Sequence, residues 1–141
     1  MKIIKINKYD EEISKFLFQL RNKSYVRKYS LNNEIIEFDN HKLWLKKYLK
    51  KNIINLILFK KQKVGYIRLE KNKKLIDCSW AILKKFQGNN FASNGLQVST
   101  KKKTKYRALI KINNVASKKV ADKANFVLKS IRNNIQYFYK N

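Results

Sequence analysis

The chain has 141 residues, of which 34 are Lys or Arg and 9 are Asp or Glu, giving a formal net charge of +25. Hydrophobic residues make up 44% of it, which allows one domain with a substantial core and argues against a disordered basic tail. Its apolar runs are too short to span a bilayer, and the N-terminus becomes polar too early for a signal peptide. The single cysteine, Cys78, excludes an internal disulfide and a multi-cysteine metal site. We therefore expect one cytoplasmic domain over residues 1–141.

The positive charge comes mainly from lysine, because arginine occurs only at positions 21, 27, 68, 107 and 132. Residues with AT-rich codons, such as Asn, Ile, Tyr and Phe, are abundant and Pro is absent, which indicates base-composition bias at tolerant surface positions. A protein that reads nucleic acid favours arginine for bidentate contacts. The composition therefore predicts general attraction to anions without specific nucleic-acid binding.

The N-terminal third predicts one short strand and two helices. Residues 2–6 alternate as in a strand. Asp10 can cap a helix whose apolar residues recur at i, i+3, i+4 and i+7 up to Leu20. The polar stretch 21–34 reads as a short helix or a loop, and a second helix begins near Asp39.

The middle of the chain predicts a three-stranded meander followed by a loop and a helix. Residues 55–59, 64–70 and 75–83 are strand-like and are separated by lysine-rich turns, the pattern of two successive hairpins. A turn rich in Gly and Asn leads into a helix at 92–102. Gly95 weakens that helix by about 1 kcal/mol relative to Ala.

The last third predicts a strand at 106–112, a helix at 113–126 and a final hairpin of 126–131 with 135–140. Asn125 is suited to a left-handed residue after the helix. The strand–loop–helix–strand segment is a crossover, so two strands are parallel in an otherwise antiparallel sheet. We expect a mixed α/β (α+β) fold with about six or seven strands and about four helices.

Two short motifs stand in order in the second half of the chain. Residues 87–92, Gln-Gly-Asn-Asn-Phe-Ala, follow a predicted central strand, and residues 114–117, Asn-Val-Ala-Ser, with Asn-Phe at 125–126, belong to a late helix. They begin 27 residues apart, which leaves room for a helix and a strand between them. Together they resemble the [Gln/Arg]-x-x-Gly-x-[Gly/Ala] motif and the Asn-x-x-Ser and Gly-Phe motif of the GNAT superfamily of acyl-CoA-dependent N-acetyltransferases, with Asn90 in place of a glycine.

The resemblance implies a sheet splayed at its central parallel pair and acetyl-CoA as cofactor. Backbone N–H groups of the loop and the following helix N-terminus would bind the pyrophosphate, and the preceding strand would pair with the pantetheine. The tyrosine that many members use as a general acid is replaced by Ala121, so the proton donor lies elsewhere or turnover has been lost. The residues implied in cofactor binding are Ile82, Leu83, Gln87, Gly88, Asn89, Asn90, Phe91, Ala92, Ser93, Asn114 and Ser117.

The N-terminal third carries a narrower resemblance, to the members that acetylate amino-sugar nucleotides such as pseudaminic acid precursors. It rests on Leu-Arg-Asn at 20–22, Val-Arg-x-x-Ser at 26–30 and His-x-x-Trp at 41–44. It implies a small-molecule primary amine as acceptor, on a nucleotide-linked sugar. Scarce arginines suit a diphosphate, and tryptophans can stack on a base or sugar. The candidate substrate-binding residues are Arg21, Asn22, Arg27, His41, Trp44, Arg68 and Trp80.

Three residues are candidates for proton transfer during direct attack of a neutral amine on a thioester. His41 is the only histidine and has an ordinary pKa near ~6.5. Asp77 is a carboxylate inside an apolar strand, where burial would raise its pKa. Tyr137 in the last strand can donate to a thiolate. Each also has a purely structural reading, as a half-buried histidine, a solvent-facing aspartate or a packing tyrosine.

Two other functions remain open. The first is a basic module that binds nucleic acid or another acidic partner on a degenerate GNAT scaffold. The second is acetylation of protein or peptide N-termini. The motif at 87–92, together with Asn114 and Ser117, favours an enzyme because a polyanion binder does not need it. We expect a monomer or a homodimer.

Overall fold

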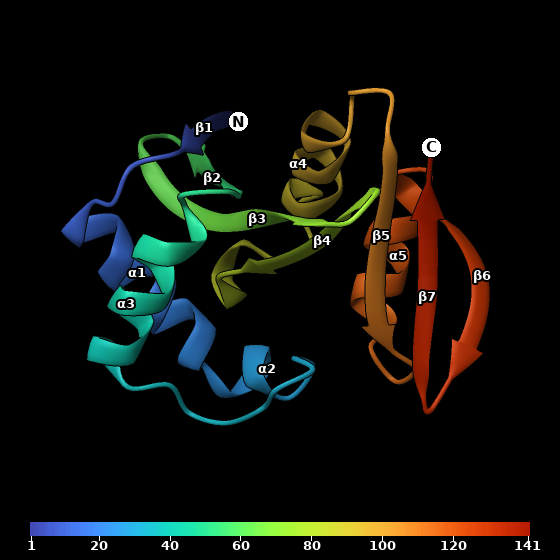
Figure 1. The fold of residues 1–141 in the computed structure, drawn as a ribbon, viewed down its shortest axis with the longest axis horizontal. Helices are drawn as coiled ribbons and strands as arrows, with labels where there is room; N and C mark the ends of the chain where they lie inside the picture. The colour runs from blue at the N-terminus through green and yellow to red at the C-terminus, as the bar shows by residue number, and fades with distance from the viewer.

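The computed structural model describes all of residues 1–141 and contains one seven-stranded sheet with helices on both faces (Figure 1). The strand order is β1-β2-β3-β4-β5-β7-β6, and only the β4–β5 pair is parallel. None of the helices has the length and hydropathy needed to cross a bilayer. The strands are β1 Lys2–Ile6, β2 Ile53–Phe59, β3 Gln62–Asn72, β4 Leu75–Ile82, β5 Lys105–Lys111, β6 Val127–Arg132 and β7 Ile135–Lys140. The helices are α1 Glu11–Asn22, α2 Ser24–Arg27, α3 Phe38–Tyr48, α4 Phe91–Ser99 and α5 Val115–Lys123, with a 3-10 turn η1 at Lys84–Phe86.

The N-terminal helices form where the sequence predicts them. The Asp10 carboxylate accepts a hydrogen bond from the Ile13 N–H at 2.9 Å, which confirms the predicted cap of α1. Leu17 and Leu20 of α1 pack with Leu45 of α3 in one core cluster against the sheet. The polar stretch after α1 contains the short helix α2 followed by a loop that leads to α3.

The sheet separates two core clusters because successive side chains of a strand point to opposite faces. On β2, Ile54 and Leu56 belong to the cluster beneath α1 and α3, whereas Ile57 belongs to the cluster beneath α4 and α5. The helix α4 approaches the sheet closely at Gly95, where a Cβ atom would lie 2.9 Å from Ile57 Cδ1. The glycine that weakens the predicted helix therefore allows close packing, and a larger residue there would require the end of the Ile57 side chain to shift.

Tight turns join the antiparallel strands. In the β2–β3 hairpin Lys60 and Lys61 both have positive φ, as do Asn133 and Asn134 in the β6–β7 hairpin. Two left-handed residues match the twist of a two-residue hairpin, and Asn tolerates this conformation better than Lys. Asn125, which follows the C-cap residue Ala124 of α5, has a φ of 69°, as predicted.

The parallel pair β4–β5 is joined over only a few residues. Leu75, Ile76 and Asp77 of β4 pair with residues 105–107 of β5. The remainder of β4, Cys78–Ile82, pairs with β3 alone, so the two strands diverge and leave a fork between them (Figure 1). The predicted splay is confirmed, and the α4 N-terminus follows the end of β4 at its open side.

Candidate active site

The loop between η1 and α4 presents a row of unpaired backbone donors. The backbone N–H groups from Gly88 to Ser93 donate to no other backbone group. Gly88 has a φ of +83°, and a Cβ built on it would meet nothing within 4 Å, so the chain here borders open space. Free N–H groups at the positive end of a helix form a site for an anion. This is the position predicted for a pyrophosphate.

Asn90 adopts the left-handed conformation that a glycine, the residue of the GNAT motif at this position, would adopt easily. It is the N-terminal cap residue of α4 and is left-handed, with φ 63° and ψ 15°. Its side-chain Oδ1 accepts a hydrogen bond from Lys123 Nζ at 2.7 Å, which brings an ammonium group from the end of α5 to the loop. Gln87 Nε2 donates to the Ile82 carbonyl at 3.1 Å and closes the loop onto β4.

The second motif forms a helix cap. The Asn114 carboxamide oxygen accepts from the Ser117 N–H at 3.1 Å, and Asn114 is buried at the start of α5. Ala121 is fully buried in the core cluster of α4 and α5, so this position offers no proton donor. A contact of Asn114 or Ser117 with a cofactor remains a prediction.

A cavity of about 340 Å³ lies on the opposite face of the sheet, between α1, α3, β2, β3 and the loop after α2. Four of the residues predicted to bind substrate line it, although they come from three different elements. They are Arg21 of α1, His41 and Trp44 of α3, and Arg68 of β3. The structure therefore brings these four predicted residues together at one site.

Several polar atoms at this cavity are buried without a hydrogen-bond partner. They are Arg21 Nη1, His41 Nδ1 and Arg68 Nε, together with the adjacent Tyr48 hydroxyl. The Arg68 guanidinium lies over the rings of Trp44 and Tyr48, at 4.9 and 5.1 Å from their centroids. Buried polar groups are nearly always satisfied in folded proteins, so these atoms mark a place for a polar ligand or water.

His41 is neutral at pH 7. It is only 3% exposed, and this burial, with the positive charges of Arg68 and Arg21, lowers its pKa to about 4. A neutral imidazole can donate one hydrogen bond to a ligand and accept another, but with its lowered pKa it is a weak base. The electrostatics therefore favour substrate binding over general base catalysis for this residue.

Asn22 and Arg27 shape the wall of the cavity without lining it. The Asn22 side chain donates to the Ile36 carbonyl at 2.7 Å and accepts from the Ile36 N–H at 2.9 Å. Arg27 Nε donates to the Asn22 carbonyl at 3.1 Å. These contacts fix the loop after α2, whose Asn32 and Ile36 face the cavity.

The other predicted residues lie elsewhere. Asp77 accepts two hydrogen bonds from Arg107, at 2.6 and 2.9 Å, so its carboxylate is engaged at the base of the fork. Tyr137 on β7 is half-buried beneath the Arg132 guanidinium, 4.3 Å from its ring centroid. Trp80 is half-buried against the core cluster of α4 and α5. None of the three lines the cavity.

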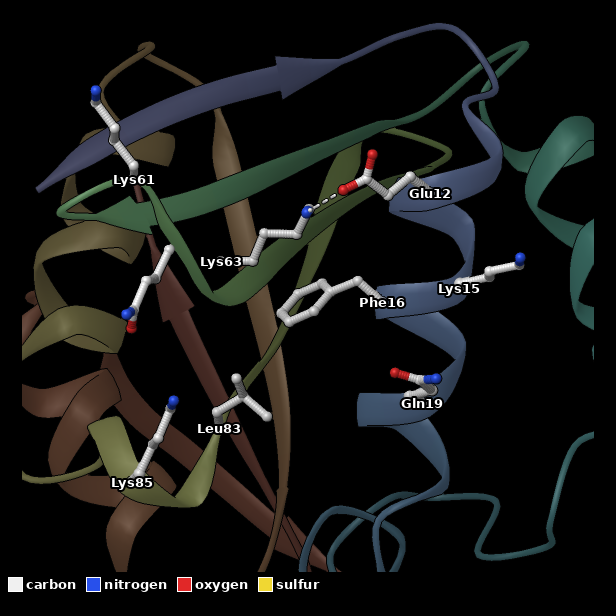
Figure 2. Close-up of a pocket in the computed structure, with 9 residues that line it drawn as sticks. Glu12, Lys15, Phe16, Gln19, Lys61, Lys63, Leu83 and Lys85 are labelled. Carbon is white, nitrogen blue, oxygen red and sulfur yellow. Dashed lines mark hydrogen bonds and ion pairs between the residues drawn. The ribbon is translucent and has the colours of Figure 1, made fainter.

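A second hollow, of about 460 Å³, opens between α1 and the tip of the β2–β3 hairpin. Lys15, Lys61 and Lys85 are exposed, and Figure 2 shows Lys63 pointing from β3 toward Glu12 of α1, with which it pairs at 3.1 Å. It has only two apolar lining residues, Phe16 and Leu83. It is a solvated basic surface of the kind that the composition predicts.

Sequence reasoning missed three residues that matter here. Tyr66 lines the cavity, and its position two residues before Arg68 places both side chains on the same face of β3. That period-two spacing was a signal the sequence offered. No sequence signal pointed to Asn32, whose contact depends on the loop, or to Arg107, whose position depends on the parallel register of β4 and β5.

No protein-family model and no curated protein sequence matches the chain. Solved structures match it over nearly its whole length. A domain from Methanocaldococcus jannaschii DSM 2661 aligns with a TM-score of 0.84 and 18% identity, covering 99% of this chain and 98% of the other. The GNAT-family acetyltransferase from Bacillus anthracis aligns with a TM-score of 0.79 and 17% identity, covering 99% of this chain and 93% of the other. The spermidine N-acetyltransferase from Vibrio cholerae, solved with CoA and spermine, aligns with a TM-score of 0.81 and 15% identity, covering 98% of this chain and 94% of the other. The chain therefore has the fold of GNAT-family acetyltransferases, as predicted.

Proposed function

We propose that the chain is an N-acetyltransferase that moves the acetyl group of acetyl-CoA to a primary amine. The observation that carries this proposal is the row of unpaired N–H groups from Gly88 to Ser93, placed beside the fork between β4 and β5. A polyanion binder that uses surface lysines needs neither feature. The shared fold with acetyltransferases, one of them solved with CoA, supports the same proposal.

The residues present fit the cofactor. The N–H groups of the loop would hold the pyrophosphate, with Lys123 adding positive charge beside Asn90. The edge of β4 at Cys78–Ile82, which has no strand partner on the β5 side, would pair with the amide groups of the pantetheine. Bound acetyl-CoA would supply the acetyl thioester. As the amine nitrogen forms the new C–N bond, the C–S bond breaks, the nitrogen gives up one proton and the leaving sulfur takes one up.

The cavity residues would bind the acceptor and favour its reactive form. The charges of Arg21 and Arg68 disfavour an ammonium ion, so the amine binds more readily as the neutral nucleophile. His41 Nδ1 can exchange a hydrogen bond with the acceptor. Tyr137 lies opposite Leu109 of β5, and we propose its hydroxyl as the proton donor to the leaving sulfur.

An amino-sugar nucleotide is the acceptor that we favour. Two of the three segments that carry the narrower resemblance contribute to the cavity: residues 20–22, at the end of α1, supply Arg21, and residues 41–44, on α3, supply His41 and Trp44. The third, residues 26–30, covers the end of α2 and the turn after it, where Arg27 holds the Asn22 carbonyl. Two arginines facing that cavity suit the phosphates of a nucleotide.

Acetyl transfer to a panel of amines tests this function. The purified protein is incubated with acetyl-CoA and a uridine-diphosphate-linked amino sugar, a short peptide or spermidine, and release of free CoA thiol and product mass are followed. We expect transfer to at least one amine, with the nucleotide sugar the fastest. A folded protein that binds no acetyl-CoA would overturn the proposal. Transfer to the peptide alone would move the acceptor class to protein N-termini.

A further inference from the structure

The cavity contains two guanidinium groups with unused donors. Arg21 Nη2 donates to the Asn32 carbonyl at 2.5 Å, but Nη1 is buried and has no partner. Arg68 Nη2 lies 3.5 Å from a Glu70 oxygen, but Nε is buried and has no partner. Leaving a buried charged donor unpaired is costly, so the empty positions are suited to an acceptor from outside the chain.

Nothing in the cavity wall neutralises these charges. Arg21 and Arg68 are the only charged residues that line it. Glu70, the acidic partner of Arg68, lies outside the cavity and has 44% of its side chain exposed. It pairs with only one Arg68 nitrogen, Nη2. Burial and the charge of Arg68 lower the pKa of Arg21. A bound anion would relieve both the desolvation and the repulsion.

The remaining wall can position such an anion. His41, 3% exposed, leaves Nδ1 unpartnered at the same cavity and carries no charge at pH 7. Leu17 and Ile54 supply apolar walls, and Trp44 supplies an exposed aromatic edge. Charge-assisted hydrogen bonds from arginine to an oxyanion strengthen when water is displaced by such walls.

We propose that this cavity binds an oxyanion, a carboxylate or a phosphate, between Arg21 and Arg68, and that the acceptor must carry this group near its amine. The second part rests on the proposed acetyltransferase function, whereas anion binding does not. The charge argument excludes polyamines, although the Vibrio cholerae enzyme of the same fold was solved with spermine. Arg21, which has no acidic partner, and Arg68, whose one ion pair is with the partly exposed Glu70, would repel a polycation.

His41 provides a specific reporter because it is the only histidine. Its imidazole resonances are followed by NMR while inorganic phosphate, acetate or spermidine is added at constant ionic strength. We expect a saturable shift with phosphate or acetate, the tighter of the two identifying the oxyanion, and no saturable shift with spermidine. Arg21→Gln and Arg68→Gln should each weaken anion binding about tenfold, the loss of one charge-assisted bond. Arg132→Gln, on the exposed strand β6, should leave it unchanged.

The outcomes are separable. A shift that does not saturate, or an equal loss in Arg132→Gln, would overturn the anion site, since both indicate general attraction to a basic surface. Arg21→Lys and Arg68→Lys serve if a Gln variant does not fold, and they should bind the anion more weakly than wild type because lysine lacks the planar fork.

The acceptor requirement is tested separately, by comparing glucosamine 6-phosphate with glucosamine as acceptor. Saturable anion binding without acetyl transfer would defeat only the proposed function, and equal transfer to spermidine would defeat only the acceptor requirement.

Discussion

Asp77 and Arg107 form a bidentate ion pair at the last residue pair that joins β4 to β5. The Nε–Oδ1 distance is 2.6 Å and the Nη2–Oδ2 distance is 2.9 Å. From the next residue onward β4 pairs only with β3. The ion pair therefore lies at the point where the fork opens. The hydrogen bonds that Arg107 donates to Asp77 raise the pKa of Arg107.

We predict that this pair stabilises the base of the fork. Asp77→Asn, Arg107→Gln and the double variant form a cycle, measured by urea unfolding at pH 7. The coupling free energy should be about 1–3 kcal/mol, because both hydrogen bonds are charge-assisted and both side chains are largely shielded from water. Additive effects of the two substitutions would show that the pair contributes no stability of its own.

The left-handed conformation of Asn90 should matter more than its side chain. Asn90→Gly keeps the conformation and removes only the contact with Lys123, so acetyl-CoA affinity should stay within about threefold of wild type. In Asn90→Val a β-branched residue strains the loop by about 1–2 kcal/mol, and affinity should fall about tenfold. Isothermal titration compares the two. Equal affinity of the Val and Gly variants would mean that loop geometry does not control binding.

Asn114 should act on stability through the α5 cap. Asn114→Ala removes the acceptor for the Ser117 N–H and should lower the free energy of unfolding by about 1 kcal/mol. Asn114→Asp and Asn114→Ser retain a capping oxygen and should lose much less. Urea unfolding measures all three. An Ala variant as stable as wild type that binds acetyl-CoA poorly would instead identify Asn114 as a cofactor contact.

His41 should make stability depend on pH. Its folded pKa of about 4 lies below the unfolded value of ~6.5, so the unfolded state takes up a proton first as the pH falls. The contribution of neutral His41 to the free energy of unfolding is fully present above about pH 6.5 and is lost as the pH falls toward 4. Between pH 7 and 5 the loss should be about 2 kcal/mol in the wild type.

His41→Gln is the control for this titration, because general charge repulsion acts equally on both proteins. The wild type should lose about 2 kcal/mol more than the variant between pH 7 and 5, as measured by urea unfolding. Parallel pH profiles of the two proteins would show that the imidazole titrates normally in the folded state.

Local patterns in the sequence were sufficient to predict most of the fold. Strand alternation, the Asp10 cap and the turns all act between near neighbours, and each is confirmed. The end of α4 was predicted three residues too late, because Ser99 ends the helix before the lysine run. The reason for Gly95 was inaccessible, since it depends on Ile57 from a distant strand.

The candidate site was predicted less evenly. Motif spacing identified the loop that carries the free N–H groups, and scarcity of arginine singled out Arg21 and Arg68, which meet in the cavity. Scarcity did not separate them from Arg27, which supports a loop. The pairing of Asp77 with Arg107 follows from a parallel register that no local pattern specifies.

The central claim is that the loop from Gly88 to Ser93 binds the pyrophosphate of acetyl-CoA. Isothermal titration of acetyl-CoA into wild type, Asn89→Asp and Asn133→Asp tests it most directly. Asn89 lies in the exposed loop and Asn133 in the remote β6–β7 turn, so the same change of charge is made at both. We predict at least about tenfold weaker binding for Asn89→Asp, from repulsion of the phosphates, and wild-type binding for Asn133→Asp. Equal affinities of the two variants would contradict the account.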